Sequence, residues 1–155
     1  MTQTPLDNLF AQRQRKADEL RAMGVNPYAN DFRRDILVQD FLARFAPLDK
    51  AALEGTPTQH ALCGRVVAIN SFGKAAFVRM VDGSSAAGRG DDEAGRLQLY
   101  IRRDGLSEDA WQVFKRLDLG DFIGVRGTPM RTKTGELSLS VEDFRLLTKA
   151  LRPLP

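Results

Sequence analysis

Two short segments of the chain combine a two-residue hydrophobic period with side chains that could bind nucleic acid. Phe77 and Arg79 alternate with aliphatic residues over 76–81, and Gln98 does so over 97–102. Successive side chains of a strand point to opposite faces, so the aliphatic residues predict an inner face and leave these polar and aromatic residues outside. An exposed phenylalanine ring can stack on a nucleobase, arginine can contact phosphate, and a glutamine amide can hydrogen-bond to a base edge.

A carboxylate near the end of the chain could add base selectivity. Glu136 follows Gly135 in a predicted turn, and an ionised carboxylate only accepts hydrogen bonds, so it would select a base that presents an N–H, such as N3 of uracil. Arg65, Lys74 and Arg131 are either phosphate contacts or ordinary surface charge.

Each of these assignments has a structural alternative. A strand register shifted by one residue would turn Phe77 into the core. Gln98 is alternatively a plain solvent-facing strand residue, and Glu136 an ordinary turn residue.

The elements that must position these residues form a recognisable order. Five segments from residue 62 onward have strand periodicity, and a helix capped by Ser107 and ended by Gly120 stands between the third and fourth. A five-stranded Greek-key barrel with a helix in that place is the OB-fold, whose second and third strands carry the binding face. The sequence therefore predicts a mainly β chain, with the strands centred on residues 66–68, 76–81, 97–102, 122–125 and 137–141.

The residues before the barrel predict a helical extension. A partial apolar stripe over 6–23, ended by Gly24, indicates the first helix. Asp35 or Asp40 could cap a second, short helix, and Asp49 could cap a third turn.

Composition and charge exclude some classes of function and favour others. The chain has 155 residues and a net charge of +3, and the basic excess lies entirely within residues 60–155, which favours polyanions. One cysteine, Cys63, and one histidine, His60, exclude an internal disulfide and make a metal cluster or a Ser-His-Asp triad hard to build; we expect His60 to be a surface residue before a strand. No phosphate-binding loop or run long enough to cross a bilayer is present, and we expect a cytoplasmic protein with no membrane partner.

Four stretches closely resemble the N-terminal part of bacterial-type class II lysyl-tRNA synthetases. They are GVNPYANDFRRD (24–35), SFGKAAFVRMVDG (71–83), GRLQLYIRRD (95–104) and LDLGDFIGVRGTPMRTKTGELSLSVEDFRLLTKALRPLP (117–155). With this resemblance we expect a helical extension and connector over 1–59, an anticodon-binding OB-fold over 60–149, and in 150–155 the start of a linker to a catalytic domain that this chain lacks.

In that family the OB-fold domain binds the uracil-rich anticodon of lysine tRNA. The resemblance places the family's stacking phenylalanine on Phe77, its base-reading glutamine on Gln98 and its last-loop glutamate on Glu136. These are the residues that strand alternation and the turn had already put on the binding surface.

Two features depart from the family pattern. Asn70 stands where relatives often carry an arginine, which puts one phosphate or base contact in doubt; Arg65 or Arg79 could compensate. Residues 84–95, rich in Gly, Ser, Ala and Asp, replace a tight turn and predict an enlarged flexible loop between the second and third strands.

The resemblance implies a lysine–tRNA ligase as the parent protein, an ATP- and magnesium-dependent homodimer. We expect this chain alone to bind the anticodon stem-loop without activating lysine or binding ATP. Two other functions stay open. One is a non-specific single-stranded nucleic-acid-binding OB protein, and the other is a protein-interaction module that uses the leading helix and the sheet edge.

Overall fold

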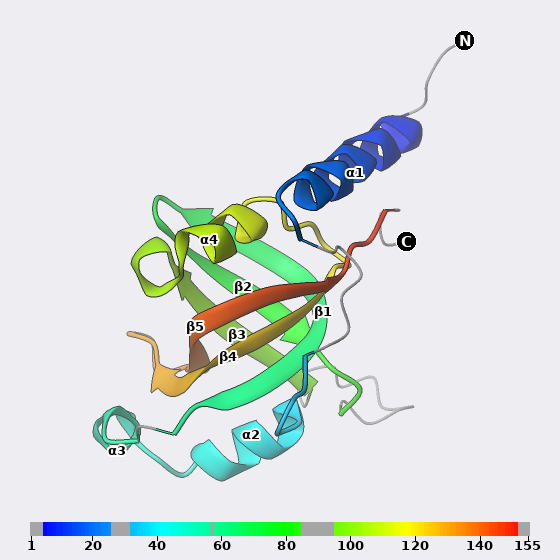
Figure 1. The fold of residues 1–155 in the computed structure, drawn as a ribbon. Helices are drawn as coiled ribbons and strands as arrows, with labels where there is room; N and C mark the ends of the chain where they lie inside the picture. Colours follow the sequence, from blue (N-terminus) through cyan, green and yellow to red (C-terminus); the bar gives the residue numbers. More distant parts are fainter. Residues whose placement is uncertain (1–4, 26–31, 57, 85–94, 152–155) are drawn as a thin grey trace.

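The strands of this computed structural model, which describes residues 5–25, 32–56, 58–84 and 95–151, form one closed barrel. They are β1 (His60–Phe72), β2 (Ala75–Val81), β3 (Arg96–Arg102), β4 (Phe122–Arg131) and β5 (Leu137–Thr148). Around the barrel the order is β1-β2-β3-β5-β4 (Figure 1). β3 and β5 pair in parallel, whereas the other neighbours are antiparallel. This is the OB-fold predicted from the sequence.

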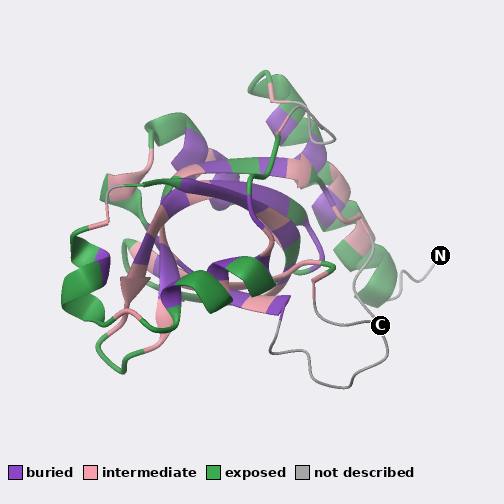
Figure 2. Cartoon of the chain, turned by 90° about the horizontal axis from the view of Figure 1, so that it is seen from below, coloured by how far each residue is buried: buried purple, intermediate pink, exposed green. Residues whose placement is uncertain are grey.

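The pleat of β2 and β3 settles which side chains face outward. Phe77, Arg79, Gln98 and Tyr100 are half-buried on the outside, and buried residues line the inside of the ring (Figure 2). The predicted strand phase is confirmed, and the register that would bury Phe77 is excluded. The fully buried partners are Ala76, Val78, Met80, Leu97, Leu99 and Ile101.

Helices surround the barrel, with α4 above it and α2 below it in the view of Figure 1. α4 begins at the predicted cap, because the Ser107 hydroxyl oxygen accepts a hydrogen bond from the Ala110 amide at 3.1 Å. It ends well before Gly120, where the sequence had predicted its end. Its aromatic face is buried, and Phe114 meets Phe144 of β5 edge to face with 5.8 Å between ring centroids. The helices are α1 (Pro5–Ala22), α2 (Val38–Phe45), α3 (Lys50–Glu54) and α4 (Glu108–Phe114), with a 3-10 turn over Arg103–Gly105.

The cap of α2 differs from the prediction. Neither Asp35 nor Asp40 caps the helix; instead the Asp82 carboxylate, which follows β2, accepts from the Val38 amide at 2.8 Å. Asp35 accepts a hydrogen bond from the Ala61 amide at 3.1 Å. The α2 terminus is therefore fixed by a residue more than forty positions away. For α3, the predicted Asp49 cap is confirmed, with Asp49 accepting from Ala52 N at 2.9 Å.

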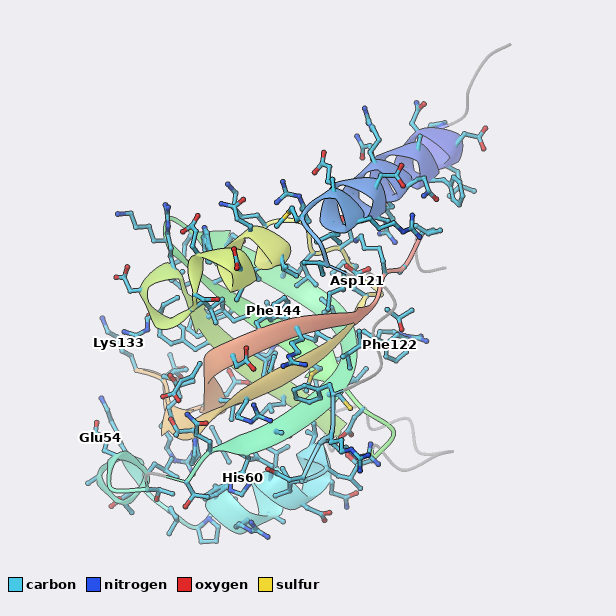
Figure 3. The ribbon with its side chains drawn as sticks, viewed as in Figure 1. Glu54, His60, Asp121, Phe122, Lys133 and Phe144 are labelled. Carbon is cyan, nitrogen blue, oxygen red and sulfur yellow. The ribbon has the colours of Figure 1, made fainter. Side chains whose placement is uncertain are left out.

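The prediction that His60 lies on the surface is wrong. Its ring is packed against Phe41 and Phe45 of α2, at centroid distances of 6.2 and 5.5 Å. Its Nδ1 lies 3.3 Å from Asp35 Oδ1. The first residue of β1 is buried because α2 folds across the end of the strand (Figure 3).

α1 is attached to the barrel through the second half of its length. Leu20 is fully buried, Lys16 Nζ donates to Asp118 Oδ1 at 2.7 Å, and Arg116 Nε donates to Glu19 Oε2 at 2.8 Å. The predicted helix over 6–23 is thus confirmed as α1. No helix among the described residues is long and apolar enough to cross a membrane.

A buried ionic network lies where α1 meets the end of β5. Lys149, whose side chain is fully buried, donates to Asp118 at 2.6 Å and to Asp121 at 2.7 Å. Burial raises the pKa of the Asp118 carboxyl, but Lys149 and Lys16 outweigh that effect and hold this pKa below its ordinary value. For Asp121, burial dominates and raises the pKa.

Candidate nucleic-acid interface

A groove of about 570 Å³ lies on the outer face of β2 and β3. The β4–β5 turn forms one wall and α3 stands across from the strands; Lys133 of the turn and Glu54 of α3 lie at the same end of the molecule in Figure 3. Three of the predicted site residues line it. Its lining is Lys50, Leu53, Glu54, Phe72, Phe77, Gln98, Tyr100, Pro129, Met130, Arg131, Thr132, Lys133, Thr134 and Glu136.

Three aromatic rings from three adjacent strands form a row on this surface. Phe77 lies between Phe72 and Tyr100, with ring centroids 5.4 and 5.2 Å away. Phe72 is 48% exposed, and Phe77 and Tyr100 are register partners across β2 and β3. Flat rings at this spacing and exposure are a stacking platform for nucleobases.

A two-pronged ion pair stands beside the rings. Arg79 Nη1 lies 2.9 Å from Glu136 Oε1, and Arg79 Nη2 donates to Glu136 Oε2 at 3.2 Å. Such a fork fixes the plane of the carboxylate and leaves a second acceptor direction on each oxygen. Glu136 is thereby held at the groove with acceptor capacity to spare.

The amide of Gln98 is held by β5. Ser138, which pairs with Gln98 across the parallel β3–β5 ladder, donates from its hydroxyl to Gln98 Oε1 at 2.9 Å. Because this bond turns the amide oxygen toward β5, the NH₂ group is turned away from β5 and can donate to a ligand.

The turn that carries Glu136 has a tight local structure. Gly135 adopts a φ of +89°, which favours glycine because it has no Cβ. The Thr132 amide donates to the Glu136 carbonyl at 3.0 Å, and the Gly135 amide donates to the Thr132 carbonyl at 2.9 Å. These bonds set the direction in which Glu136 leaves the turn.

Arg131, which the sequence left as a phosphate contact or surface charge, lines the groove and makes structural hydrogen bonds. Its guanidinium donates to three backbone carbonyls: Ala46 at 2.9 Å, Leu48 at 3.0 Å and Gly135 at 2.9 Å. It therefore joins the segment between α2 and α3 to the β4–β5 turn, and so holds the two walls of the groove together.

The remaining predicted residues lie at or beyond the edge. Asn70 is exposed and pairs with Phe77 across β1 and β2, which places it beside the aromatic row. Arg65 is far along β1, with its guanidinium 4.8 Å above the Phe122 ring on another part of the barrel. Lys74 lies in the β1–β2 turn, outside the groove lining. Of loop 84–95, residues 85–94 lie outside the described residues.

Several groove residues were not predicted. Phe72 was detectable, because it lies two positions after Asn70 on the same face of β1, and a longer strand prediction would have included it. Lys50 and Leu53 had no local signal, since only the fold of the α2–α3 segment brings them to the barrel.

The closed barrel and its aromatic, polar groove define an OB-fold nucleic-acid-binding domain. In agreement, residues 90–147 match the family model described as an OB-fold nucleic acid binding domain of the tRNA anticodon type.

Lysine–tRNA ligases from several bacteria are similar to this chain over nearly its whole length. The chain is 42% identical over 147 residues to a lysine–tRNA ligase of Anaeromyxobacter sp. (strain K), which covers 95% of this chain. It is 44% identical over 151 residues to that of Aeromonas hydrophila, and 40% identical over 149 residues to that of Listeria welshimeri, covering 97% and 96% of this chain. The chain spans 27 to 28% of the length of these relatives. The chain is thus similar, over nearly its whole length, to part of each of these lysine–tRNA ligases, as the sequence resemblance had indicated.

Proposed function

We propose that this chain binds the anticodon stem-loop of lysine tRNA and recognises its uracils by stacking and by base-edge hydrogen bonds. The observation that supports this most strongly is the outward aromatic row of Phe72, Phe77 and Tyr100 beside Gln98 and Glu136. The curated relatives are lysine–tRNA ligases, so the RNA that suits this groove is the tRNA of those enzymes.

We assign affinity for RNA to the aromatic rings of the groove and selectivity among bases to its polar side chains. The rings supply stacking, which every base accepts. Glu136 and Gln98 face the base edge, where hydrogen bonds distinguish one base from another. Lys50 and Lys133 line the same groove and suit the phosphates of the bound strand.

Binding of a lysine anticodon stem-loop, compared with one whose central uracil is replaced by cytosine, tests this function. We expect the uracil form to bind at least tenfold more tightly at a fixed salt concentration. Equal affinity for the two RNAs would contradict specific readout.

The alternative function, non-specific binding of single strands, makes a different prediction in the same assay. Oligo-dT would then compete with the stem-loop at similar affinity, and affinity would fall steeply with salt whatever the base. The ion-paired carboxylate of Glu136 in the groove favours the specific function. A carboxylate repels the phosphates of a bound strand, so a hydrogen bond to a base explains its place in the groove better than non-specific binding does.

We further propose that ligase activity with ATP and magnesium, a homodimer and a cytoplasmic location belong to this domain when it is joined to a catalytic domain, as in proteins named lysine–tRNA ligase. Among the described residues, no group of three or more His, Cys, Asp or Glu side chains could hold a metal ion.

A further inference from the structure

Ser138 and Arg79 hold the two polar side chains of the groove, Gln98 and Glu136. We propose that Ser138 and Arg79 are positioning residues that set the hydrogen-bond polarity of the groove, so that it accepts a base edge with a carbonyl next to an N–H. This inference rests on the proposed function and specifies the ligand of the same groove.

The Gln98 amide is oriented by Ser138. An amide side chain can present either its oxygen or its NH₂ group, and its partners decide which one. Ser138 is fully buried and has one hydroxyl proton. Its nearer acceptor is Gln98 Oε1 at 2.9 Å, while the backbone carbonyl of Glu136 lies at 3.3 Å. The short bond to Gln98 turns the amide oxygen toward β5 and leaves the NH₂ group as the donor for a ligand.

The Glu136 carboxylate is oriented by Arg79. The two nitrogens of Arg79 hold the two oxygens of Glu136 at 2.9 and 3.2 Å. A carboxylate offers about four acceptor directions, of which the fork uses two. Arg79 therefore fixes the orientation of Glu136 and leaves it acceptor capacity for a base N–H.

The two groups belong to one recognition element. Arg79 and Gln98 are cross-strand partners in β2 and β3, and Gln98 and Glu136 line the same groove. A fixed donor beside a fixed acceptor complements uracil, whose carbonyl accepts and whose N3–H donates. The same pair opposes cytosine, which presents an amino donor and an unprotonated ring nitrogen on that edge.

The test uses Ser138→Ala in the whole chain. Wild type and variant are titrated with the lysine anticodon stem-loop carrying uracil or cytosine at the central anticodon position. Without the Ser138 hydroxyl the amide can reverse, and we expect the preference for uracil over cytosine to fall about tenfold, the worth of one hydrogen bond. Ser140→Ala is the matched control, because it removes a hydroxyl from the next outward position of the same strand and should preserve the preference.

A double-mutant cycle shows whether Ser138 acts through Gln98. In a Gln98→Ala background, Ser138→Ala should change the base preference no further. Arg79→Lys keeps the charge and loses the fork, so it should weaken discrimination against a stem-loop with N3-methyluridine at the central position.

Three outcomes are distinguishable. A drop in preference that needs Gln98 supports the inference. An unchanged preference in Ser138→Ala overturns it while leaving the proposed function in place. A wild-type chain with no uracil preference overturns both.

Discussion

The groove contains two kinds of residue, aromatic rings in a row and polar side chains that are each held by a partner. Phe77 has aromatic neighbours on both sides, so a base that stacks on it meets a continuous surface. Glu136 and Gln98 are each held by one partner, Arg79 and Ser138. Removing a ring should therefore weaken binding to every base, whereas changing a held polar group should alter preference.

For Phe77→Ala we expect binding of the anticodon stem-loop to weaken by about 1–3 kcal/mol, because the central ring of the stacking row is lost. Fluorescence anisotropy with labelled RNA measures this. Phe122→Ala is the control, since Phe122 is also an outward aromatic residue (38% exposed) but lies under Arg65 and outside the groove. Comparable losses in both variants would argue against the groove as the binding site.

For Glu136→Gln we expect base preference to fall more than affinity for the uracil stem-loop. The amide keeps one acceptor oxygen but adds a donor that can serve a cytosine ring nitrogen. The ratio of dissociation constants for the uracil and cytosine stem-loops reports the effect. A variant with the wild-type ratio and weaker binding overall would show that Glu136 supports the groove without reading the base.

At the scale of secondary-structure elements, one arginine joins the two walls of the groove. Arg131 connects the carbonyls of Ala46 and Leu48, before α3, with that of Gly135 in the β4–β5 turn. α3 has only five residues, too few to be stable by itself. Its position beside the barrel must come from such tertiary contacts.

Arg131→Met should therefore release α3 while the barrel stays folded. We expect a loss of about 1–3 kcal/mol in the free energy of unfolding and faster amide hydrogen exchange across α2 and α3. Lys133→Met, in the same turn, is the control and should leave exchange in α3 as in wild type. Unchanged exchange in the Arg131 variant would mean that other contacts hold this wall.

The sequence predicted those elements whose information is local. Alternation in β2 and β3 was sufficient to put Phe77 and Gln98 outside, because a strand has a period of two and its inner face was clearly aliphatic. Ser107 and Asp49 were recognisable caps. The Arg79–Glu136 pair and the Asp82 cap were not predictable, since they join segments that only the closed barrel brings together. The same holds for His60, which is buried by α2.

At the scale of the whole molecule, Lys16 joins α1 to the buried network of Asp118, Asp121 and Lys149, in addition to the other contacts of α1 with the barrel. The groove lies on a different part of the barrel from this junction. The groove should thus keep its base preference when the network is weakened, provided that the barrel remains folded.

The network should make stability depend on acid pH. The pKa of Asp118 in the folded chain lies below its ordinary value of 3.8, so its contribution is present above pH 3.8 and is lost as the pH falls through the folded pKa. Asp118→Asn should lower the free energy of unfolding by about 1–3 kcal/mol near neutral pH, and the difference from wild type should shrink in acid. Denaturation by urea at several pH values measures it.

Asp18→Asn is the control for that series, because Asp18 pairs with Arg21 on the exposed side of α1. It should have little effect at any pH. A difference between Asp118→Asn and wild type that persists far below pH 3.8 would show that the network stabilises by packing and not by charge.

The most direct test of the proposed function identifies the residue that contacts the central anticodon base. A lysine anticodon stem-loop with 5-iodouridine at the central position is bound to the chain, irradiated, and the cross-linked residue is identified by mass spectrometry. We expect a cross-link to Phe72, Phe77 or Tyr100, the three rings of the groove. A cross-link to Phe122 or to α1 would contradict the proposed function.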